Sequence, residues 1–234
     1  MENIIEVRNL RKTFGKLEVL KGISCSFKRS QAVCVLGPNA SGKTTLIKSI
    51  LGMVIPDEGE IFFNSKPVIN TFDYKKDIGY MPQIGNYPEN MKIGQLFEMM
   101  MDIRAMHAGL DTDLLKAFNL ENMYGKAMRT LSGGTRQKVS AALAFMFNPS
   151  VLVLDEPTAG LDPLAAEILK EKILVEKDKG KLILVTSHIM SEVEEIADQV
   201  LYLTDGIIKF YKALESLKAE TGEQRLGKAL TKII

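Results

Sequence analysis

Residues 37–44 read Gly-Pro-Asn-Ala-Ser-Gly-Lys-Thr, and this stretch decides the fold because it has the P-loop pattern Gly-x-x-x-x-Gly-Lys-[Ser/Thr]. An apolar run at 32–36 predicts a strand before it, and residues 46–51 predict a helix after it. Glycines let successive N–H groups point inward, and the helix that follows adds the positive end of its dipole. The stretch therefore predicts a polyphosphate site rather than a chance glycine turn before a helix.

Two side chains of the loop suit a nucleoside triphosphate with Mg²⁺. Lys43 can bridge the terminal phosphates as a point charge. The Thr44 hydroxyl can ligate Mg²⁺, which usually keeps several waters and shares phosphate oxygens with the protein.

The composition indicates a globular chain with a sizeable core. It has 234 residues, 46% of them hydrophobic. The 30 basic residues against 29 acidic ones give a net charge of +1, which disfavours a nucleic-acid partner. Cys25 and Cys34 fall at alternating positions of predicted strands, which favours core packing over a disulfide or a metal site and suits a reducing cytoplasm.

No stretch of the sequence predicts a membrane span or a leader. The longest apolar runs, such as 141–147, are far shorter than the ~20 residues that cross a bilayer. The first residues, Met-Glu-Asn, lack a basic region followed by an apolar one. Any role at a membrane must then come through a partner.

Residues 4–10, 23–27 and 60–63 predict strands, and we expect them to form a mixed sheet around the strand before the P-loop. Phe14 lies in a glycine turn between the first two. It could fill the core, or it could offer a ring face to a base, an interaction worth ~1–3 kcal/mol in single-stranded nucleic-acid complexes.

The middle of the chain predicts an inserted helical lobe. Residues 93–106, 110–120 and 134–147 place apolar side chains at three- and four-residue spacing. The run Met99-Met100-Met101 could suggest metal binding, but successive helix positions point in different directions, so packing is the better interpretation.

Two strands in the second half end in residues that suit phosphate chemistry. Residues 151–154 form an all-apolar strand, typical of burial on both faces, that ends in Asp155 and Glu156. Beside a triphosphate, one carboxylate can hold Mg²⁺ and the other can polarise a water. The alternative interpretation is that the two residues are only the polar end of a strand. A helix predicted from Asp162-Pro163 to about 178 is followed by a strand at 181–186 and then by His188.

His188 is expected to meet a γ-phosphate, because ligands gather at the carboxyl ends of strands in open α/β sheets. His107 lies on a polar stretch and is expected to be exposed without a chemical role. Strands at 199–204 and 207–211 and a charged helical tail complete the chain.

A further motif, Leu131-Ser132-Gly133-Gly134, stands between the P-loop and the acidic strand. With it, the chain resembles the nucleotide-binding subunits of ABC transporters from end to end. Ser132 and the amides of the two glycines open a helix and form a second phosphate-binding surface. The resemblance implies that this surface faces the P-loop of another subunit, so that two ATP molecules are held in a head-to-tail dimer.

The resemblance also implies the architecture. We expect an α/β P-loop NTPase with a RecA-like core, an N-terminal antiparallel β subdomain and an inserted α-helical subdomain. Residues 1–83 and 148–212 would form the nucleotide-binding core, 84–147 the helical subdomain and 213–234 a helical tail.

The resemblance assigns roles residue by residue. Glu156 would be the general base, His188 would contact the γ-phosphate, and Gln83 would join catalysis and relay the state of the site to a membrane partner. Asp162 would end a loop, 159–162, that links two sites. Phe14 would contact adenine, and the ATP contacts would be Gly37, Pro38, Asn39, Ala40, Ser41, Gly42, Lys43, Thr44 and Thr45. The Mg²⁺ ligands would be Thr44, Gln83 and Asp155. The ATP of the opposing subunit would contact Leu131, Ser132, Gly133 and Gly134.

The chain departs from the family pattern at two positions. Phe14 replaces the commoner tyrosine, which keeps the stacking face and loses a hydroxyl. Thr135 stands where most members carry glutamine; because Ser132 and the glycines are kept, we expect a weakened contact rather than a dead site.

The implied function is ATP hydrolysis that energises a separately encoded permease. The subunit would dimerise, most simply with an identical copy, and lie on the cytoplasmic face of the inner membrane through the permease. More narrowly, residues 79–91 and 131–140 resemble NosF-type ATPases, which serve copper-site maturation of nitrous oxide reductase.

Three alternatives stay open from the sequence. The first is ABC-2-type export of another substrate. The second is a soluble ABC ATPase acting on ribosomes or DNA, although such proteins usually carry two cassettes or a long coiled-coil insertion. The third is a nucleotide-gated binding module without hydrolysis, which intact Glu156 and His188 disfavour.

Overall fold

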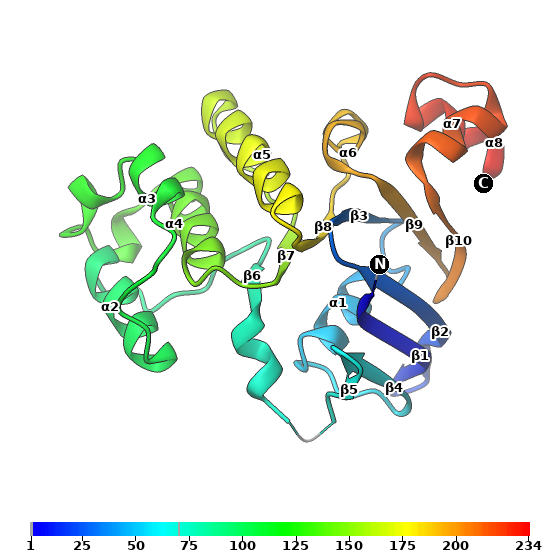
Figure 1. Cartoon of the computed structure of the whole chain (residues 1–234), viewed down its shortest axis with the longest axis horizontal. Coiled ribbons are helices and arrows are strands. Elements are labelled where there is room, and N and C mark those ends of the chain that lie inside the picture. Colours follow the sequence, from blue (N-terminus) through cyan, green and yellow to red (C-terminus); the bar gives the residue numbers. More distant parts are fainter. Residues whose placement is uncertain (1, 70) are drawn as a thin grey trace.

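The computed structural model describes residues 2–69 and 71–234 and contains two sheets, with most of its helices along the parallel one (Figure 1). The first sheet is antiparallel, with the order β2-β1-β4-β5. Its strands are β1 (Asn3–Phe14), β2 (Leu17–Lys28), β4 (Glu58–Phe63) and β5 (Lys66–Pro67).

The second sheet has six strands in the order β10-β9-β3-β8-β7-β6. All neighbours are parallel except β9 and β10, which form an antiparallel pair. Its strands are β3 (Gln31–Leu36), β6 (Ile78–Met81), β7 (Val151–Asp155), β8 (Leu182–Thr186), β9 (Gln199–Thr204) and β10 (Ile207–Ala213).

The antiparallel β subdomain that the resemblance implied is confirmed, whereas the expectation that the strands at 4–10, 23–27 and 60–63 join a mixed sheet around the P-loop strand is wrong. Strands β1, β2 and β4 pair with one another, whereas β3 pairs with β8 and β9. The long strands β1 and β2 are separated by two residues, and so short a connection favours an antiparallel hairpin. The all-apolar β3 instead needs cover on both faces, which the parallel sheet provides.

The helices gather in separate places. Figure 1 shows α2, α3 and α4 at one end of the molecule and α7 and α8 at the other. The helices are α1 (Lys43–Ile50), α2 (Ile93–Arg104), α3 (Asp113–Ala117), α4 (Gly133–Met146), α5 (Pro163–Asp178), α6 (Met190–Ile196), α7 (Leu214–Thr221) and α8 (Leu226–Ile233), with single 3₁₀ turns at Asp73–Asp77, Glu121–Met123 and Met128–Thr130.

Two of the expected helices in the inserted lobe are shorter than predicted. The helix expected at 110–120 is reduced to α3, since the chain turns at Asn119 with a φ of 53°. The helix expected at 93–106 stops at Arg104, because Ala105 adopts a left-handed conformation with a φ of 47°. Apolar periodicity continued past both points, so it did not reveal these ends.

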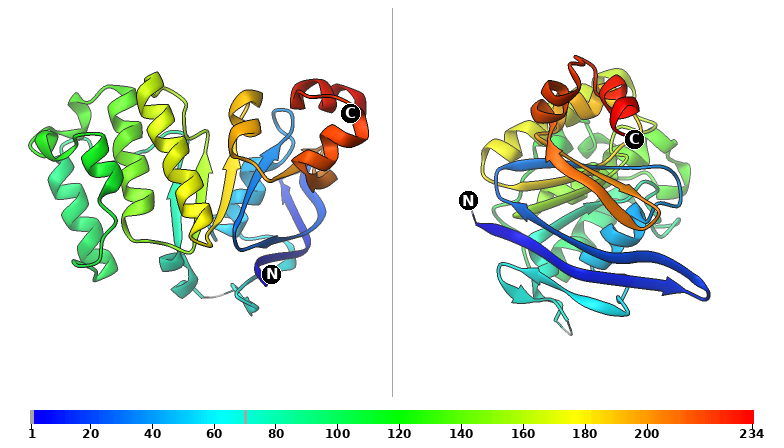
Figure 2. Two further views of the ribbon diagram at one scale, coloured as in Figure 1. Left: turned by 45° about the horizontal axis from the view of Figure 1, so that its top comes forward. Right: turned by 90° about the vertical axis from the view of Figure 1, so that its right-hand side faces the viewer.

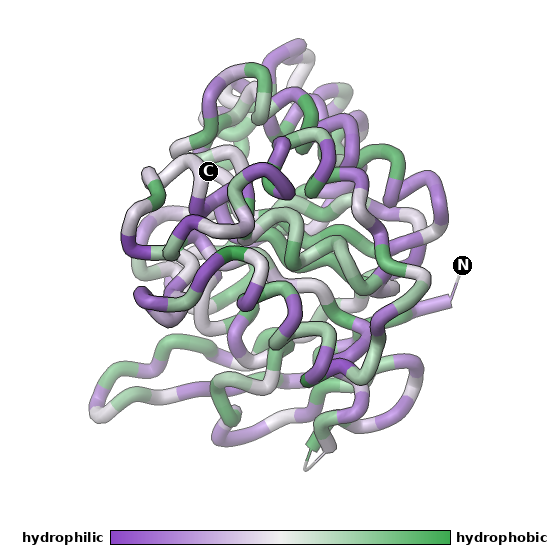
Figure 3. Tube along the Cα trace, turned by 90° about the vertical axis from the view of Figure 1, so that its left-hand side faces the viewer, coloured by the Kyte–Doolittle hydropathy of each residue, from purple (hydrophilic) through white to green (hydrophobic). Residues whose placement is uncertain are grey.

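The six-stranded sheet separates two hydrophobic clusters. On β3, Ala32, Cys34 and Leu36 join a cluster with the apolar faces of α2 to α5. The alternate residues Val33 and Val35 join a cluster with α1 and the antiparallel sheet. Strands β3, β7 and β8 are therefore buried on both faces. Figure 2 shows the sheet between the helices and the antiparallel strands, and Figure 3 shows hydrophobic segments in the middle of the molecule with hydrophilic ones around them.

The cysteines and methionines behave as packing residues. Cys34 is fully buried and Cys25 is half-buried, and both are free thiols. Burial raises the pKa of each thiol to about 12. Met99, Met100 and Met101 are half-buried against the core, which confirms the packing interpretation.

Within the described residues, no helix combines the length and the apolarity needed to traverse a bilayer.

Candidate active site

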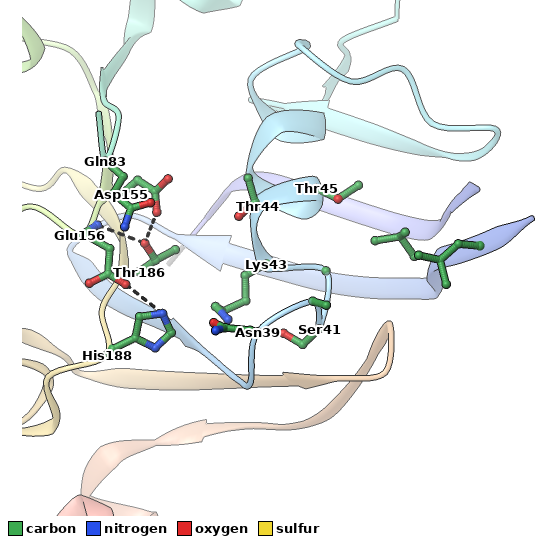
Figure 4. Close-up of a pocket in the computed structure, with 14 residues that line it drawn as sticks. Asn39, Ser41, Lys43, Thr44, Thr45, Gln83, Asp155, Glu156, Thr186 and His188 are labelled. Carbon is green, nitrogen blue, oxygen red and sulfur yellow. Dashed lines mark hydrogen bonds and ion pairs between the residues drawn. The ribbon is translucent and has the colours of Figure 1, made fainter. Parts of the chain in front are cut away.

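A cavity of about 310 Å³ lies where β3, β6, β7 and β8 end at the carboxyl edge of the parallel sheet. Figure 4 shows the P-loop on one side of it and the ends of β7 and β8 on the other. Its lining residues are Leu17, Val19, Asn39, Ala40, Ser41, Gly42, Lys43, Thr44, Thr45, Gln83, Asp155, Glu156, Thr186 and His188.

The P-loop glycines are required by the backbone. Gly37 has a φ of 147°, and a Cβ there would lie 1.9 Å from the carbonyl oxygen of Leu203. Gly42 has a φ of 103° at the N-cap of α1, and a Cβ there would lie 2.9 Å from the carbonyl oxygen of Val19. No side chain caps α1, and its first turn holds no acidic residue, so its N-terminal amides suit an anion.

Lys43 lies along the inside of the loop. Its Nζ donates hydrogen bonds to the carbonyl oxygens of Gly37 at 2.7 Å and Pro38 at 2.9 Å. Desolvation lowers the pKa of Lys43, and the carboxylates of Glu156 and Asp155 act in the opposite direction. The ammonium group thus sits in a partly dry pocket, where its attraction for phosphate oxygens is stronger than in water.

Thr186 organises the two acidic residues opposite the P-loop. Its hydroxyl donates to the carboxylate of Asp155. The backbone N–H of Glu156 donates to the carbonyl oxygen of Thr186 at 3.1 Å and approaches its hydroxyl oxygen at 3.2 Å. These bonds hold Glu156 at a φ of 51°, which is uncommon for this residue type.

Thr186 was missed as a site residue. The signal that could have found it is a polar residue at the end of an all-apolar strand, at the level where the neighbouring strand ends in Asp155.

Glu156 and His188 meet across the ends of β7 and β8. Nε2 of His188 lies 3.2 Å from Oε1 of Glu156, and the two side chains are 56% and 12% exposed. Burial raises the pKa of Glu156, although the nearby His188 acts to lower it. A carboxylate with a raised pKa beside a phosphate site is suited to accept a proton from water.

The candidate metal donors share one chemistry. Thr44, Gln83 and Asp155 all line the cavity and supply a hydroxyl, an amide and a carboxylate oxygen. Mg²⁺ prefers such hard oxygen donors, so these residues fit it. In the part of the chain that the structure describes, no group of three or more His, Cys, Asp or Glu residues could hold a metal ion.

Phe14 lies outside the cavity lining. It is 49% exposed, so its interpretation as core filler is wrong. Nζ of Lys12 lies 5.3 Å from the centre of its ring, within cation–π range. Leu17 and Val19, from the same hairpin, line the cavity and were not predicted from the sequence. His107, as expected, is exposed, with Nε2 3.5 Å from a carboxylate oxygen of Asp102.

The motif at 131–134 also lies outside the lining of this cavity. Ser132 caps α4: its Oγ accepts from the N–H of Thr135 at 3.2 Å and lies 2.9 Å from the Thr135 hydroxyl. Ser132 and Gly133 are exposed. The chain therefore presents a second helix N-terminus without an acidic first turn, away from its own P-loop.

Asp162 is held within the chain. Oδ1 accepts from the N–H of Ala165 at 2.9 Å and caps α5, while Oδ2 accepts from Nζ of Lys138 at 2.6 Å. Because Lys138 belongs to α4, this ion pair ties the loop at 159–162 to the helix that follows the 131–134 motif.

A P-loop at the carboxyl edge of a parallel sheet, opposite two carboxylates, defines a P-loop nucleoside-triphosphate hydrolase, here with an inserted helical lobe. Comparisons with known proteins narrow this class. Residues 20–159 match the family described as "ABC transporter". The chain belongs to that family, as an ATP-binding cassette that binds and hydrolyses ATP.

Individual relatives agree with this assignment. The Nod factor export ATP-binding protein I of Burkholderia lata is 36% identical over 210 residues, covering 86% of this chain and 68% of that protein. The lantibiotic transport ATP-binding protein SrtF of Streptococcus pyogenes is 29% identical and covers 92% and 94%. A solved structure of an ATP-binding subunit of an ABC transporter has a TM-score of 0.91 at 27% identity, covering 98% of this chain and 99% of that one.

Proposed function

We propose that this ATPase energises an export permease as one half of a head-to-tail dimer. ATP would lie between the P-loop of one subunit and residues 131–134 of the other. The observation that carries this proposal is the separation of two anion-binding helix ends within one chain: α1 opens into the cavity, whereas the α4 end at Ser132 is exposed and outside it.

The geometry of the cavity supports the following catalytic roles. The P-loop amides and Lys43 hold the phosphates, and Phe14 stacks on adenine from the hairpin beside the cavity. Glu156 takes the proton of the attacking water, and His188 orients it against the γ-phosphate. Thr44, Gln83 and Asp155 would hold Mg²⁺, which would supply charge neutralisation on the phosphates. The remaining proposed ATP contacts are Gly37, Pro38, Asn39, Ala40, Ser41, Gly42 and Thr45.

The same proposal assigns tasks to the parts of the chain. Residues 1–83 and 148–212 form the nucleotide-binding core, residues 84–147 dock the permease, and residues 213–234 form a tail. The helices α2, α3 and α4 at one end of the molecule support a separate docking lobe. Gln83 joins the cavity to that lobe in sequence, so it can relay the presence of the γ-phosphate. The subunit would then lie on the cytoplasmic face of the inner membrane, through its permease.

Complementation between two inactive variants tests the composite site. In a dimer of the Lys43→Ala variant, both ATP sites lack the P-loop lysine. In a dimer of the Ser132→Arg variant, the arginine blocks both ATP sites from the side of residues 131–134. Both should be inactive when pure. A one-to-one mixture should regain about a quarter of the wild-type ATPase rate, because about half of the dimers are mixed and each mixed dimer has one complete site.

The proposal of a shared site is wrong if Ser132→Arg alone turns over ATP at the wild-type rate. It is also wrong if the mixture stays inactive although mass measurement shows that mixed dimers form.

The partner and cargo need a separate experiment. The relatives above are named for Nod factor export and lantibiotic transport, so similar ATPases serve different cargoes. Copper-site maturation of nitrous oxide reductase remains a narrower proposal, supported only by the sequences at 79–91 and 131–140. Copurification from detergent-solubilised membranes should recover an integral permease together with this chain. Recovery of ribosomes or DNA instead would contradict the transport proposal.

A further inference from the structure

The carboxylate of Glu192 joins the two loops that carry Glu156 and His188. Its Oε2 accepts hydrogen bonds from the hydroxyl of Thr158 at 2.6 Å and from that of Ser187 at 3.4 Å. Thr158 follows Glu156 by two residues, and Ser187 directly precedes His188. Thr158 and Ser187 are both buried, with 8% and 4% of their surface exposed.

The bridge formed by Glu192, Thr158 and Ser187 begins where the pairing of β7 and β8 stops. Strands β7 and β8 are in register up to the pair Asp155–Thr186, and both backbones then leave the sheet. Thr186 joins the two strand ends at the wall of the cavity. Glu192 does not line the cavity and joins the same two loops beyond that point. The pair of Glu156 and His188 is therefore held between two cross-links.

The helix that carries Glu192 is itself anchored on several sides. Val193 and Ile196 of α6 are buried in the core, at 1% and 3% exposure. Glu195 pairs with Lys170 of α5, and Glu194 accepts from the N–H of Leu226 at the start of α8. A carboxylate on such a fixed element can hold two loops at a constant spacing.

We propose that Glu192 is a positioning residue for ATP hydrolysis, which keeps the loops of Glu156 and His188 at the spacing that the reaction needs. The proposal rests on the catalytic roles proposed above for those two residues. Hydrogen bonds to a charged carboxylate are about twice as strong as neutral ones, and the bond from Thr158 has the short length of such a bond at 2.6 Å, whereas the contact from Ser187 is longer at 3.4 Å. Misplacement of a catalytic group by about 1 Å can lower a rate by about 100-fold.

The test is steady-state ATPase kinetics of the full chain. Glu192→Ala should lower kcat by about 10- to 100-fold and leave KM for ATP within about twofold, since Glu192 lies outside the cavity that receives the phosphates. Thr158→Val should have the same effect. The double variant should be no slower than the slower single variant, because both changes break one link. Glu192→Gln should recover part of the rate, since an amide oxygen still accepts a hydrogen bond.

Glu195→Ala is the matched control on the same helix. Its carboxylate faces Lys170 rather than the loops, so kcat should stay within about twofold of wild type. Thermal unfolding of every variant shows whether it is folded. If Glu192→Ala does not fold, Thr158→Val and Ser187→Ala test the same bridge from its other ends.

The inference is overturned if kcat of Glu192→Ala matches that of Glu195→Ala, if only KM rises, or if the effects of Glu192→Ala and Thr158→Val multiply. The Glu156→Gln variant distinguishes a failure of the Glu192 inference from a failure of the proposed function. Normal turnover in Glu156→Gln removes the proposed base itself. An inactive Glu156→Gln beside a fully active Glu192→Ala removes only the role of Glu192.

Discussion

Gly134, the second residue of α4, packs directly on the backbone of Gly160: a Cβ at position 134 would lie 2.7 Å from the Gly160 carbonyl oxygen. This contact joins the 131–134 motif to the loop at 159–162 within one chain. Together with the 2.6 Å ion pair between Lys138 and Asp162, it makes the two segments one packed unit.

We therefore predict that Gly134→Ala destabilises the fold, by roughly 1–3 kcal/mol, because the new methyl group forces the Gly160 backbone to move. Gly133→Ala is the matched control, as a Cβ at position 133 would meet nothing within 4 Å and alanine is the better helix former. Urea unfolding of the two variants measures the difference. Equal stabilities would show that the Gly134–Gly160 contact is not close in solution.

Glu156→Gln should abolish turnover and keep ATP binding, since the amide cannot accept the proton of the attacking water but nearly matches the carboxylate in size. With hydrolysis blocked, an ATP-bound dimer should accumulate in size-exclusion chromatography. Glu171→Gln, on the exposed surface of α5, serves as control and should turn over normally. A normal rate of phosphate release from Glu156→Gln would exclude Glu156 as the base.

The pH dependence of kcat/KM should report the environment of Glu156. Burial raises its pKa above the ordinary 4.5, with Asp155 and Glu192 acting in the same direction and His188 acting against them. As the proposed base, Glu156 works only when deprotonated, so the rate should fall on the acid side at a pH above 4.5.

His188→Ala tests the sign of this effect. Removing the imidazole removes an influence that lowers the pKa of Glu156, so the acidic limb should move to higher pH. The measurement is kcat/KM between about pH 5 and pH 8, with the residual rate of the variant normalised to its own plateau. A limb that moves to lower pH would contradict the interaction between the two side chains.

Glu176 should make the fold sensitive to acid. Its side chain is fully buried against Lys172, Lys179 and Lys181. Burial alone would raise its pKa, but the hydrogen bonds from the lysines lower it to about 2. A carboxylate with a lowered folded-state pKa stabilises the protein above its unfolded pKa, and this contribution disappears as the pH falls from about 4.5 towards about 2.

We expect Glu176→Gln to lose roughly 3 kcal/mol at pH 7, on the basis of 1.36 kcal/mol per pKa unit, and to lose less at pH 3. Urea unfolding at the two pH values gives both numbers. Glu215 is the control, because its side chain is 86% exposed and its carboxylate lies 3.8 Å from Nζ of Lys218. The Glu215→Gln substitution should leave the free energy of unfolding unchanged at both pH values. A loss that is the same at both pH values would mean that Glu176 acts by packing rather than by charge.

The sequence by itself determined the chemistry of the site. The P-loop, the acidic strand end and His188 are local patterns, because each needs only a strand, a turn and the residue types that phosphate chemistry requires. Asn39 to Thr45, Gln83, Asp155, Glu156 and His188 do meet in one cavity. Most strands and helices were also readable, since apolar periodicity is local. The exceptions are the ends of α2 and α3, the lengths of β1 and β2, which extend beyond the expected 4–10 and 23–27, and the unpredicted α6.

Only the tertiary structure decided which strands pair and which side chains support the site. Alternation does not specify a partner, so the apolar pattern alone did not show that β1, β2 and β4 form their own sheet, and only the family resemblance implied an antiparallel subdomain. Thr186 and Glu192 act through hydrogen bonds across 30 to 34 residues of chain, and no spacing rule links such positions. The residues proposed to do the chemistry are set by short-range patterns, whereas those proposed to hold them in place depend on contacts that exist only after the chain has folded.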